Sequence, residues 1–200
     1  TFLHTLSLPD ALPIYSAFEN CTNLTSVYIT DLEAWFNINF SNNGSNPLSY
    51  ANHLYLNDKE VTTLEIPDFV KHIASHAFYN CTGLTSVIIP NSVTSIGSSA
   101  FAGCINLTNI NMPNSIKSIG SNAFERCTGL TSINIPNSVA NIGPSAFEGC
   151  TGLTNIDLPN SVTSIEYSVF EGCTNLTNID LPSSITSIGS NAFERCTSLI

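Results

Sequence analysis

The sequence predicts a solenoid of mainly β structure with short helical turns, in which coils of about 23 residues stack and place a parallel sheet along one face. Three observations predict this class. Six cysteines recur at one constant interval, from Cys81 and Cys104 to Cys196. A leucine stands three residues after each of them, and a phenylalanine three residues before each. A unit this short cannot bury its own apolar side chains, so neighbouring units must stack and share a core.

The first half of each unit predicts a short strand. Apolar residues occur at alternate positions, as in Ile110 and Met112, which is the period of a strand with one buried face. A proline follows, here Pro113, and ends the strand because proline has no N–H to give to a ladder. The equivalent strands of successive coils are expected to stack in parallel, about 4.8 Å apart.

The second half of each unit predicts a turn and then a short helical segment. Gly97, Gly120, Gly143 and Gly189 are expected to turn the backbone where other residues would be strained, although Glu166 stands at this place in one unit. The following S-x-A-F-x-x-C segment is predicted to form a short helical turn that directs its Phe and Cys inward. The predicted core ladder comprises Phe78, Phe101, Phe124, Phe147, Phe170, Phe193, Cys81, Cys104, Cys127, Cys150, Cys173 and Cys196.

The spacing of the cysteines favours packing over chemistry. A zinc site built from cysteine normally has ligands two to four residues apart, and the much longer repeat interval offers none locally. Stacked coils nevertheless bring neighbouring cysteines within about 5 Å, which is inside the range for disulfide Cα pairs. Reduced, buried thiols are the favoured interpretation, with occasional disulfides and a metal site as the alternatives.

The distance between Cys21 and Cys81 reveals an insertion, because the stretch that separates them is longer than two regular units. We expect one solenoid over residues 16–200: a partial repeat at 16–30, an island at 31–60, and regular repeats at 61–200 that stop within a strand. The island either widens the core or presents a protruding binding loop at residues 42–46. The side chains expected to widen the core are Trp35, Phe36, Ile38, Phe40, Leu54 and Leu56.

Residues 1–15 do not fit the repeat. They lack the basic region of a signal peptide and contain two prolines, Pro9 and Pro13. The run from Asp10 to Ile14 resembles a translated sequencing-adaptor end. We therefore expect residues 1–15 to be non-native or irregular.

The charge balance excludes two classes of partner. The net charge is −10 with only five Lys plus Arg, so the chain has no basic surface for nucleic acid or for anionic membranes. No apolar run approaches the length of a membrane-spanning helix, so no membrane insertion of this segment is expected. Charged residues make up 10% of the chain, well below the roughly 25% of an ordinary soluble domain, so Asn, Ser and Thr must supply the polar surface.

The sequence offers no catalytic residues, no cofactor site and no metal site. Serine is abundant, but none lies in a nucleophile elbow, and no phosphate-binding loop is present. His72 and His76 are four residues apart, with His53 and Asp68 possible neighbours. They are interpreted as surface polar residues, because the segment between Val70 and Phe78 is a turn and not a regular helix.

Two rows of polar residues follow the period of the repeat. Glu125, Glu148, Glu171 and Glu194 form an acidic row on a turn, where stacked like charges repel. A solvated surface is the simplest interpretation of such rows, and a recognition stripe or weak cation site is the alternative. The other row follows the outward side of the predicted strands, which is the usual binding surface of a solenoid. Its candidate ligand-binding residues are Asn109, Asn111, Ser132, Asn134, Asn155, Asp157, Asn178 and Asp180.

The unit resembles the leucine-rich repeat of the BspA-like surface-protein family, also called the Treponema-pallidum-type repeat. The family pattern L-P-x-x-L-x-x-I-G-x-x-A-F-x-x-C is matched by Leu181-Pro182, Ile185, Ile188-Gly189, Ala192-Phe193 and Cys196. The match covers about residues 61–200, and more briefly 17–29. The resemblance implies an extracellular or cell-surface protein that is not an enzyme and that binds a host or neighbouring-cell protein or a glycan. The alternatives are a polysaccharide-acting enzyme on a parallel β-helix, and a spacer repeat within a larger surface protein.

Overall fold

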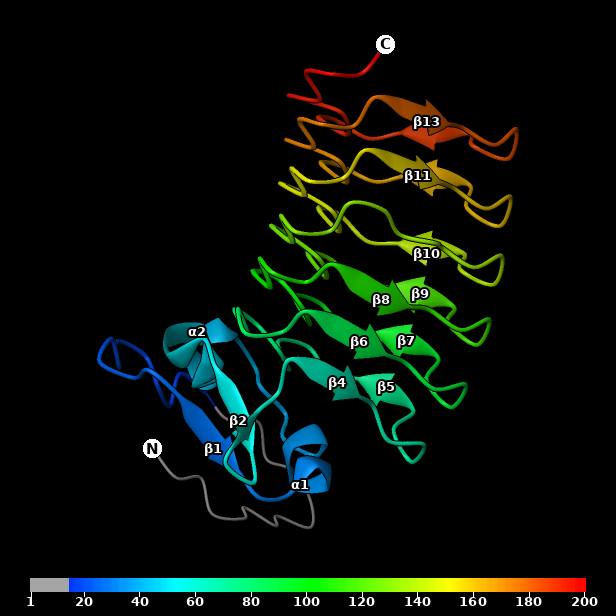
Figure 1. Ribbon diagram of the computed structural model, residues 1–200. Helices are drawn as coiled ribbons and strands as arrows, with labels where there is room; N and C mark the ends of the chain where they lie inside the picture. Colours follow the sequence, from blue (N-terminus) through cyan, green and yellow to red (C-terminus); the bar gives the residue numbers. More distant parts are fainter. Residues whose placement is uncertain (1–14) are drawn as a thin grey trace.

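The computed structural model describes residues 15–200 and shows a parallel β-solenoid (Figure 1). This confirms the predicted fold class. The regular coils stack one above another towards the C-terminal end, and the island lies at the N-terminal end of the stack. Except for Tyr15, the segment expected to be non-native lies outside the described residues.

Two parallel ladders run along the solenoid, whereas the repeat pattern predicted one sheet. Paired strands within each ladder are one repeat apart in the sequence, as in the registers Val87–Ile110 and Ile96–Ile119. The first ladder contains β4 (Thr63–Glu65), β6 (Ser86–Ile88) and β8 (Asn109–Asn111), and farther along β11 (Asn155–Asp157) and β13 (Asn178–Asp180). The second contains β5 (His72–Ile73), β7 (Ser95–Ile96), β9 (Ser118–Ile119) and β10 (Asn141–Ile142), and farther along β12 (Ser164–Ile165) and β14 (Ser187–Ile188).

Each ladder is interrupted once. In the first ladder, residues 132–134 form no strand and contribute a single bridge, from Asn134 to Asp157. The second ladder breaks between β10 and β12, next to Glu166. Gly143 N donates to Ile119 O at 2.8 Å, but within residues 15–200 Glu166 N makes no such bond to the preceding coil. A small apolar gap, lined by Ile142, Leu158, Val162, Ile165 and Phe170, lies at this break.

Glycine is required at these positions because neighbouring coils approach each other closely there. The prediction that glycine relieves a strained backbone is wrong. Gly97, Gly120, Gly143 and Gly189 do not have positive φ. A Cβ on Gly120 would lie 2.6 Å from Ser98 N of the preceding coil, and one on Gly143 would lie 2.5 Å from Ser121 N. The coil that carries Glu166 has a Cβ at this position, and it is the coil at which the ladder breaks.

The segments before each cysteine are successive turns and not the predicted helical turns. In one coil, Ala102 N donates to Ser99 O and Cys104 N donates to Phe101 O. Ser99 and Gly103 have φ of 54° and 75°, and this left-handed backbone interrupts any helix. The equivalent left-handed positions before the other cysteines are Asn20, Asn80, Arg126, Gly149, Gly172 and Arg195.

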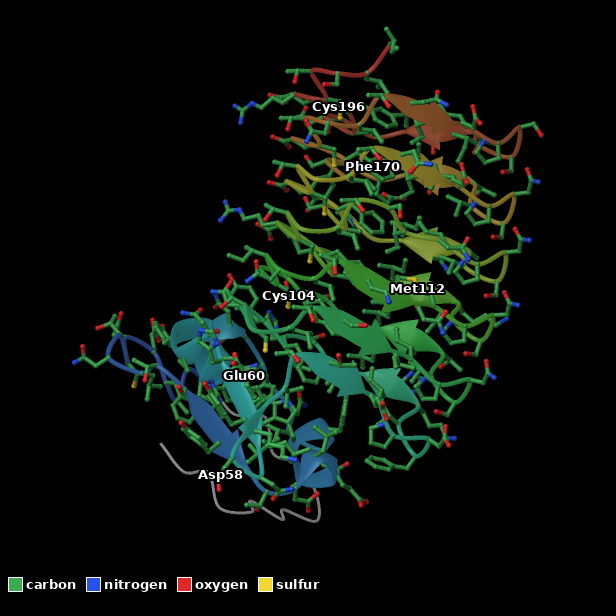
Figure 2. The ribbon with its side chains drawn as sticks, viewed as in Figure 1. Asp58, Glu60, Cys104, Met112, Phe170 and Cys196 are labelled. Carbon is green, nitrogen blue, oxygen red and sulfur yellow. The ribbon has the colours of Figure 1, made fainter. Side chains whose placement is uncertain are left out.

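The phenylalanines form a continuous stack through the regular coils. Successive rings from Phe78 to Phe193 have centroids 5.5–5.8 Å apart and lie within 15° of parallel. All are buried except Phe193, which is half-buried. The cysteines lie beside this stack, and Figure 2 shows Cys104 and Cys196 on the same side of the solenoid.

The island carries the helices of the described residues, and the partial repeat contributes a strand. Asp31 begins α1 (Leu32–Phe36), where its Oδ1 accepts from the N–H groups of Glu33 and Ala34. The other elements are β1 (Val27–Ile29), the short 3-10 helix η1 (Asn43–Ser45), α2 (Leu48–Ala51), β2 (Leu54–Leu56) and β3 (Lys59–Glu60). β1 pairs in parallel with β2, which pairs antiparallel with β3.

The island covers the N-terminal end of the phenylalanine stack. Phe36 packs edge-on against Phe78, with ring centroids 5.6 Å apart. Trp35 Nε1 donates to Ala77 O at 3.2 Å, and Trp35 is buried. The alternative of a protruding loop at residues 42–46 is wrong, because Gly44, Ser45 and Asn46 are buried beneath the partial repeat and the first regular coil.

Candidate ligand-binding face

The outward side of the first ladder is a row of exposed amides, hydroxyls and carboxylates. The strands alternate between buried and exposed residues, as in β11, where Ile156 is buried and Asn155 and Asp157 are exposed. Because successive coils pair in the same register, the exposed residues of neighbouring coils align. All eight residues predicted for this face are exposed: Asn109, Asn111, Ser132, Asn134, Asn155, Asp157, Asn178 and Asp180.

The register brings these side chains together in space. Asp157 pairs with Asp180 and Asn155 with Asn178, so that each pair lies about 4.8 Å apart along the ladder. The Asn134–Asp157 bridge continues the row across the interrupted coil. The resulting surface is acidic at its C-terminal part and amide-rich in its middle, and it can donate and accept hydrogen bonds at regular intervals.

These side chains have no partners among the described residues. Across residues 15–200, no hydrogen bond or ion pair joins any of the eight side chains to another residue. Asn106, which lies just outside the row, contrasts with them because its Nδ2 donates to Thr82 O at 2.9 Å. The polar groups of the face are therefore available to a ligand.

The acidic row on the turn is engaged differently. Glu125 accepts from Asn122 Nδ2 at 3.0 Å and lies 3.6 Å from Arg126 Nε. Arg195 Nε lies 3.8 Å from Glu194. These internal contacts make Glu125 and Glu194 weaker candidates for binding than the residues of the sheet face.

The cysteines form a structural ladder of thiols. All seven are free, and Cys81, Cys104, Cys127, Cys150 and Cys173 are buried. Each thiol from Cys104 to Cys196 donates to the Phe carbonyl of the preceding coil, as from Cys127 Sγ to Phe101 O at 3.2 Å. Burial raises the pKa of Cys81 and of Cys173 to about 12, and of the three between them well above the usual range. A neutral, buried thiol is a poor nucleophile and a poor metal ligand.

The histidines are not brought together. His53 Nδ1 lies 2.6 Å from Glu60 Oε1, and His72 Nδ1 lies 2.8 Å from Ser95 Oγ. His76 is half-buried, and this burial lowers its pKa. In the described part of the chain, no three His, Cys, Asp or Glu side chains gather as metal ligands would.

Some N-terminal residues at the same repeat position as the face residues were not predicted from the sequence. Tyr28 of β1 and Tyr55 of β2 pair in register, and their rings stack with centroids 4.7 Å apart. Ile88 lies in the row that contains Asn111, and it is 44% exposed. A signal was present, because Tyr28 and Ile88 stand seven residues after a cysteine, as Asn111 and Asp157 do. In the first ladder this row therefore begins with Glu65 and Ile88 and continues through the amides to Asp157 and Asp180, whereas the aromatic pair lies on the separate sheet of β1, β2 and β3.

Comparisons with known proteins agree with this geometry. Six copies of the BspA type leucine rich repeat region match the chain, over residues 48–150 and 117–200. No curated protein gave a significant match. No helix among residues 15–200 is long and apolar enough to cross a membrane.

Three solved structures illustrate the likeness. A leucine-rich repeat protein of Treponema pallidum is 31% identical with a TM-score of 0.56, over 70% of this chain and 78% of that one. A leucine-rich cell surface protein of Faecalibacterium prausnitzii is 41% identical with a TM-score of 0.59, over 61% of this chain and 32% of that one. A leucine-rich repeat protein of Bacteroides ovatus is 33% identical with a TM-score of 0.55, over 67% of this chain and 41% of that one. The last two matches span less than half of the neighbours' own lengths. With its repeat matched over most of its length, this chain belongs to the BspA-type leucine-rich repeat family.

Proposed function

We propose that this chain is a non-enzymatic protein-binding module of a cell-surface or secreted protein, and that it binds its partner on the exposed face of the first ladder. The observation that carries this is the row of exposed polar side chains from Asn109 to Asp180, which have no partners within residues 15–200. The paired strands beneath most of this surface fix the spacing of the main-chain positions that carry the side chains. A rigid surface loses little conformational entropy on binding.

The partner proposed is a protein on a host or neighbouring cell, and a glycan is the alternative ligand. The similarity to a leucine-rich cell surface protein of Faecalibacterium prausnitzii supports an extracellular location. The acidic end of the row, at Asp157 and Asp180, favours a basic or hydrogen-bond-donating surface on the partner.

The test uses the fluorescently labelled chain on intact cultured epithelial cells and on intact bacterial cells. We expect saturable binding that mild trypsin treatment of the target cells removes and glycosidase treatment leaves. The double variant Asp157→Asn, Asp180→Asn should weaken this binding about tenfold or more, as truncation of central interface groups does.

The matched control removes the same number of charges from the turn. The double variant Glu148→Gln, Glu171→Gln should bind as the parent does, because these side chains lie on another surface. Equal binding by the parent and the Asp157, Asp180 variant would refute the assignment of the face. Loss of binding after glycosidase treatment alone would point to the glycan.

A further inference from the structure

In the described part of the chain the first ladder ends at β4, and the outer edge of this strand carries main-chain groups without partners. Among residues 15–200, β4 pairs with β6 only. Ser86 N donates to Thr62 O, and Ile66 N donates to Ile88 O, so these groups point towards β6. The N–H and C=O groups of Thr63 and Glu65 point the opposite way, towards the island. In residues 15–200 they have no hydrogen-bond partner. An open strand edge of this kind is a template for another strand.

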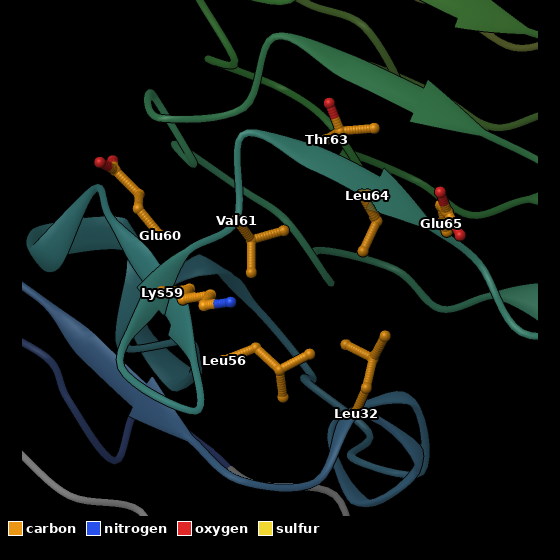
Figure 3. Close-up of a pocket in the computed structure, with 8 residues that line it drawn as sticks. All are labelled: Leu32, Leu56, Lys59, Glu60, Val61, Thr63, Leu64 and Glu65. Carbon is orange, nitrogen blue, oxygen red and sulfur yellow. The ribbon is translucent and has the colours of Figure 1, made fainter.

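A pocket of about 310 Å³ lies beside this edge. Figure 3 shows Leu32 of α1, Leu56 of β2, and Val61 and Leu64 pointing into the same space between the island and β4. The volume is at the lower limit of ligand pockets and suits one large aliphatic or aromatic side chain. Lys59, Glu60 and Glu65 also line the pocket, so charged groups surround its apolar interior.

The exposed charge beside the edge is negative. Glu65 is exposed, and within the described residues no hydrogen bond or ion pair engages its carboxylate. The Glu60 carboxylate is already bonded to His53. Side chains alternate along a strand, so the neighbours of a residue that enters the pocket would lie outward, next to Thr63 and Glu65. Opposite charges on adjacent strands attract, which favours Lys or Arg at those places.

We propose that the edge of β4 and the adjoining pocket bind an extended peptide segment of a partner protein, which adds a strand to the first ladder. The segment places one large aliphatic or aromatic residue in the pocket and a basic residue on each side of it. Main-chain hydrogen bonds to Thr63 and Glu65 supply affinity, and the pocket and the Glu65 carboxylate supply selectivity. This site is separate from the polar residues of the sheet face, because neither Asp157 nor Asp180 takes part in it.

The test uses a fluorescein-labelled peptide, Thr-Lys-Leu-Lys-Thr, blocked at both ends, and measures its anisotropy with the full chain. We expect replacement of the central Leu by Asp, or of both Lys by Glu, to weaken binding about tenfold or more. Amide hydrogen exchange with and without peptide should show new protection at Thr63 and Glu65. Protection confined to other residues would overturn the proposal, and so would the absence of peptide binding.

Two pairs of variants separate the edge from general effects. Thr63→Pro removes one edge donor that the native ladder does not use, and it should weaken peptide binding about fivefold or more while the protein stays folded. Thr63→Ala keeps the donor and should bind as the parent does. Glu65→Lys should weaken binding, whereas Asp180→Lys, the same charge change far from the pocket, should not.

The proposal is wrong if folded Thr63→Pro binds the peptide as tightly as Thr63→Ala. A second copy of this chain is the competing occupant. If the peptide does not bind, and sedimentation instead shows a dimer that Thr63→Pro dissociates, the edge serves self-association and the peptide proposal fails.

Discussion

The regular coils and the island both supply hydrogen-bond donors to the carbonyls of the next coil, but the donors are of different kinds. Within the regular coils, the carbonyl of the residue before each Phe accepts from the Phe N–H of the preceding coil, as in Phe78 N to Ala100 O at 2.8 Å. Ala77 has no regular coil beneath it, and its carbonyl accepts from the side chains of Trp35 and Asn46, both at 3.2 Å. A stack of identical units thus needs a non-identical unit at its end, in which side-chain donors replace main-chain donors.

The aromatic contacts differ in the same way. Inside the stack the Phe rings lie nearly parallel, because each has an identical neighbour one coil away. At the end, Phe36 meets Phe78 at 64°, an edge-to-face arrangement that does not require another repeat. The island therefore both extends and terminates the core.

The largest expected effect follows from the thiols, which distinguish the regular coils from the island. Unfolded thiols ionise near the ordinary value of 9, whereas burial raises the pKa of Cys81 and Cys173 to about 12. Their contribution to stability is fully present below pH 9 and is lost as the pH rises from 9 towards 12. In that window, each buried thiol lowers the free energy of unfolding by up to about 1.4 kcal/mol per pH unit. Urea unfolding between pH 8 and 11 should show this fall.

The control for the alkaline experiment removes one thiol. Cys150→Ala should flatten the dependence of the unfolding free energy on pH, even though it lowers stability at pH 8. At pH 8 the exposed Cys21 should react with a maleimide long before the buried cysteines do. A pH dependence unchanged by Cys150→Ala, or rapid labelling of all seven thiols, would contradict the assignment.

A smaller effect tests the end of the stack. Asn46 is buried, donates to His76 O and Ala77 O, and accepts from Leu48 N. Asn46→Ala leaves these groups unsatisfied and should lower the free energy of unfolding by about 1–3 kcal/mol. Hydrogen exchange should locate the loss in the island and the first regular coil.

Asn155→Ala is the matched control for the end of the stack. It removes the same type of side chain from the exposed face and should change stability by less than about 0.5 kcal/mol. Equal losses for the two variants would mean that the island does not stabilise the stack through these bonds.

The smallest expected effect concerns the break beside Glu166. Glu166→Gly removes the Cβ that Gly97, Gly120, Gly143 and Gly189 lack at this position and should let the main-chain N–H reach Ile142 O. We expect a gain of about 1 kcal/mol, because the restored hydrogen bonds outweigh the added flexibility of glycine in the unfolded chain. Thermal unfolding measures it.

The reverse substitution tests the same close approach. Gly120→Ala places a Cβ 2.6 Å from the main chain of the preceding coil and should cost about 1–3 kcal/mol. No loss from Gly120→Ala would show that the coils can separate without cost, and a loss from Glu166→Gly would show that the break itself is favourable.

The regular coils were predictable because one register explains every apolar position. The constant repeat interval placed Phe and Cys together, and proline marked the end of the first strand of each unit. The second ladder was not predictable from alternation, because its strands are only two residues long, such as Ser95–Ile96. The glycines were visible, but their role depends on atoms of another coil, such as Ser98 N near Gly120.

The island and the candidate face show where the sequence stops being informative. The residues Asn42–Asn46 have turn composition, which suggests exposure, yet Asn46 is buried because it supplies donors to a coil 30 residues later. The eight face residues follow from the repeat alone. Their lack of internal partners does not, because it depends on where every other polar side chain lies.

The coil-to-coil hydrogen bonds also determine how the molecule responds to a mechanical load. Bonds such as Gly97 N to Ile73 O lie along the axis of the stack. A force that pulls the coils apart along this axis breaks the bonds of one coil at a time. A folded coil contributes about 4.8 Å to the length of the stack. The chain of the same coil spans about 80 Å when it is fully extended. Each coil that opens therefore adds length far beyond its folded height, so the solenoid lengthens stepwise under tension while its remaining coils stay folded.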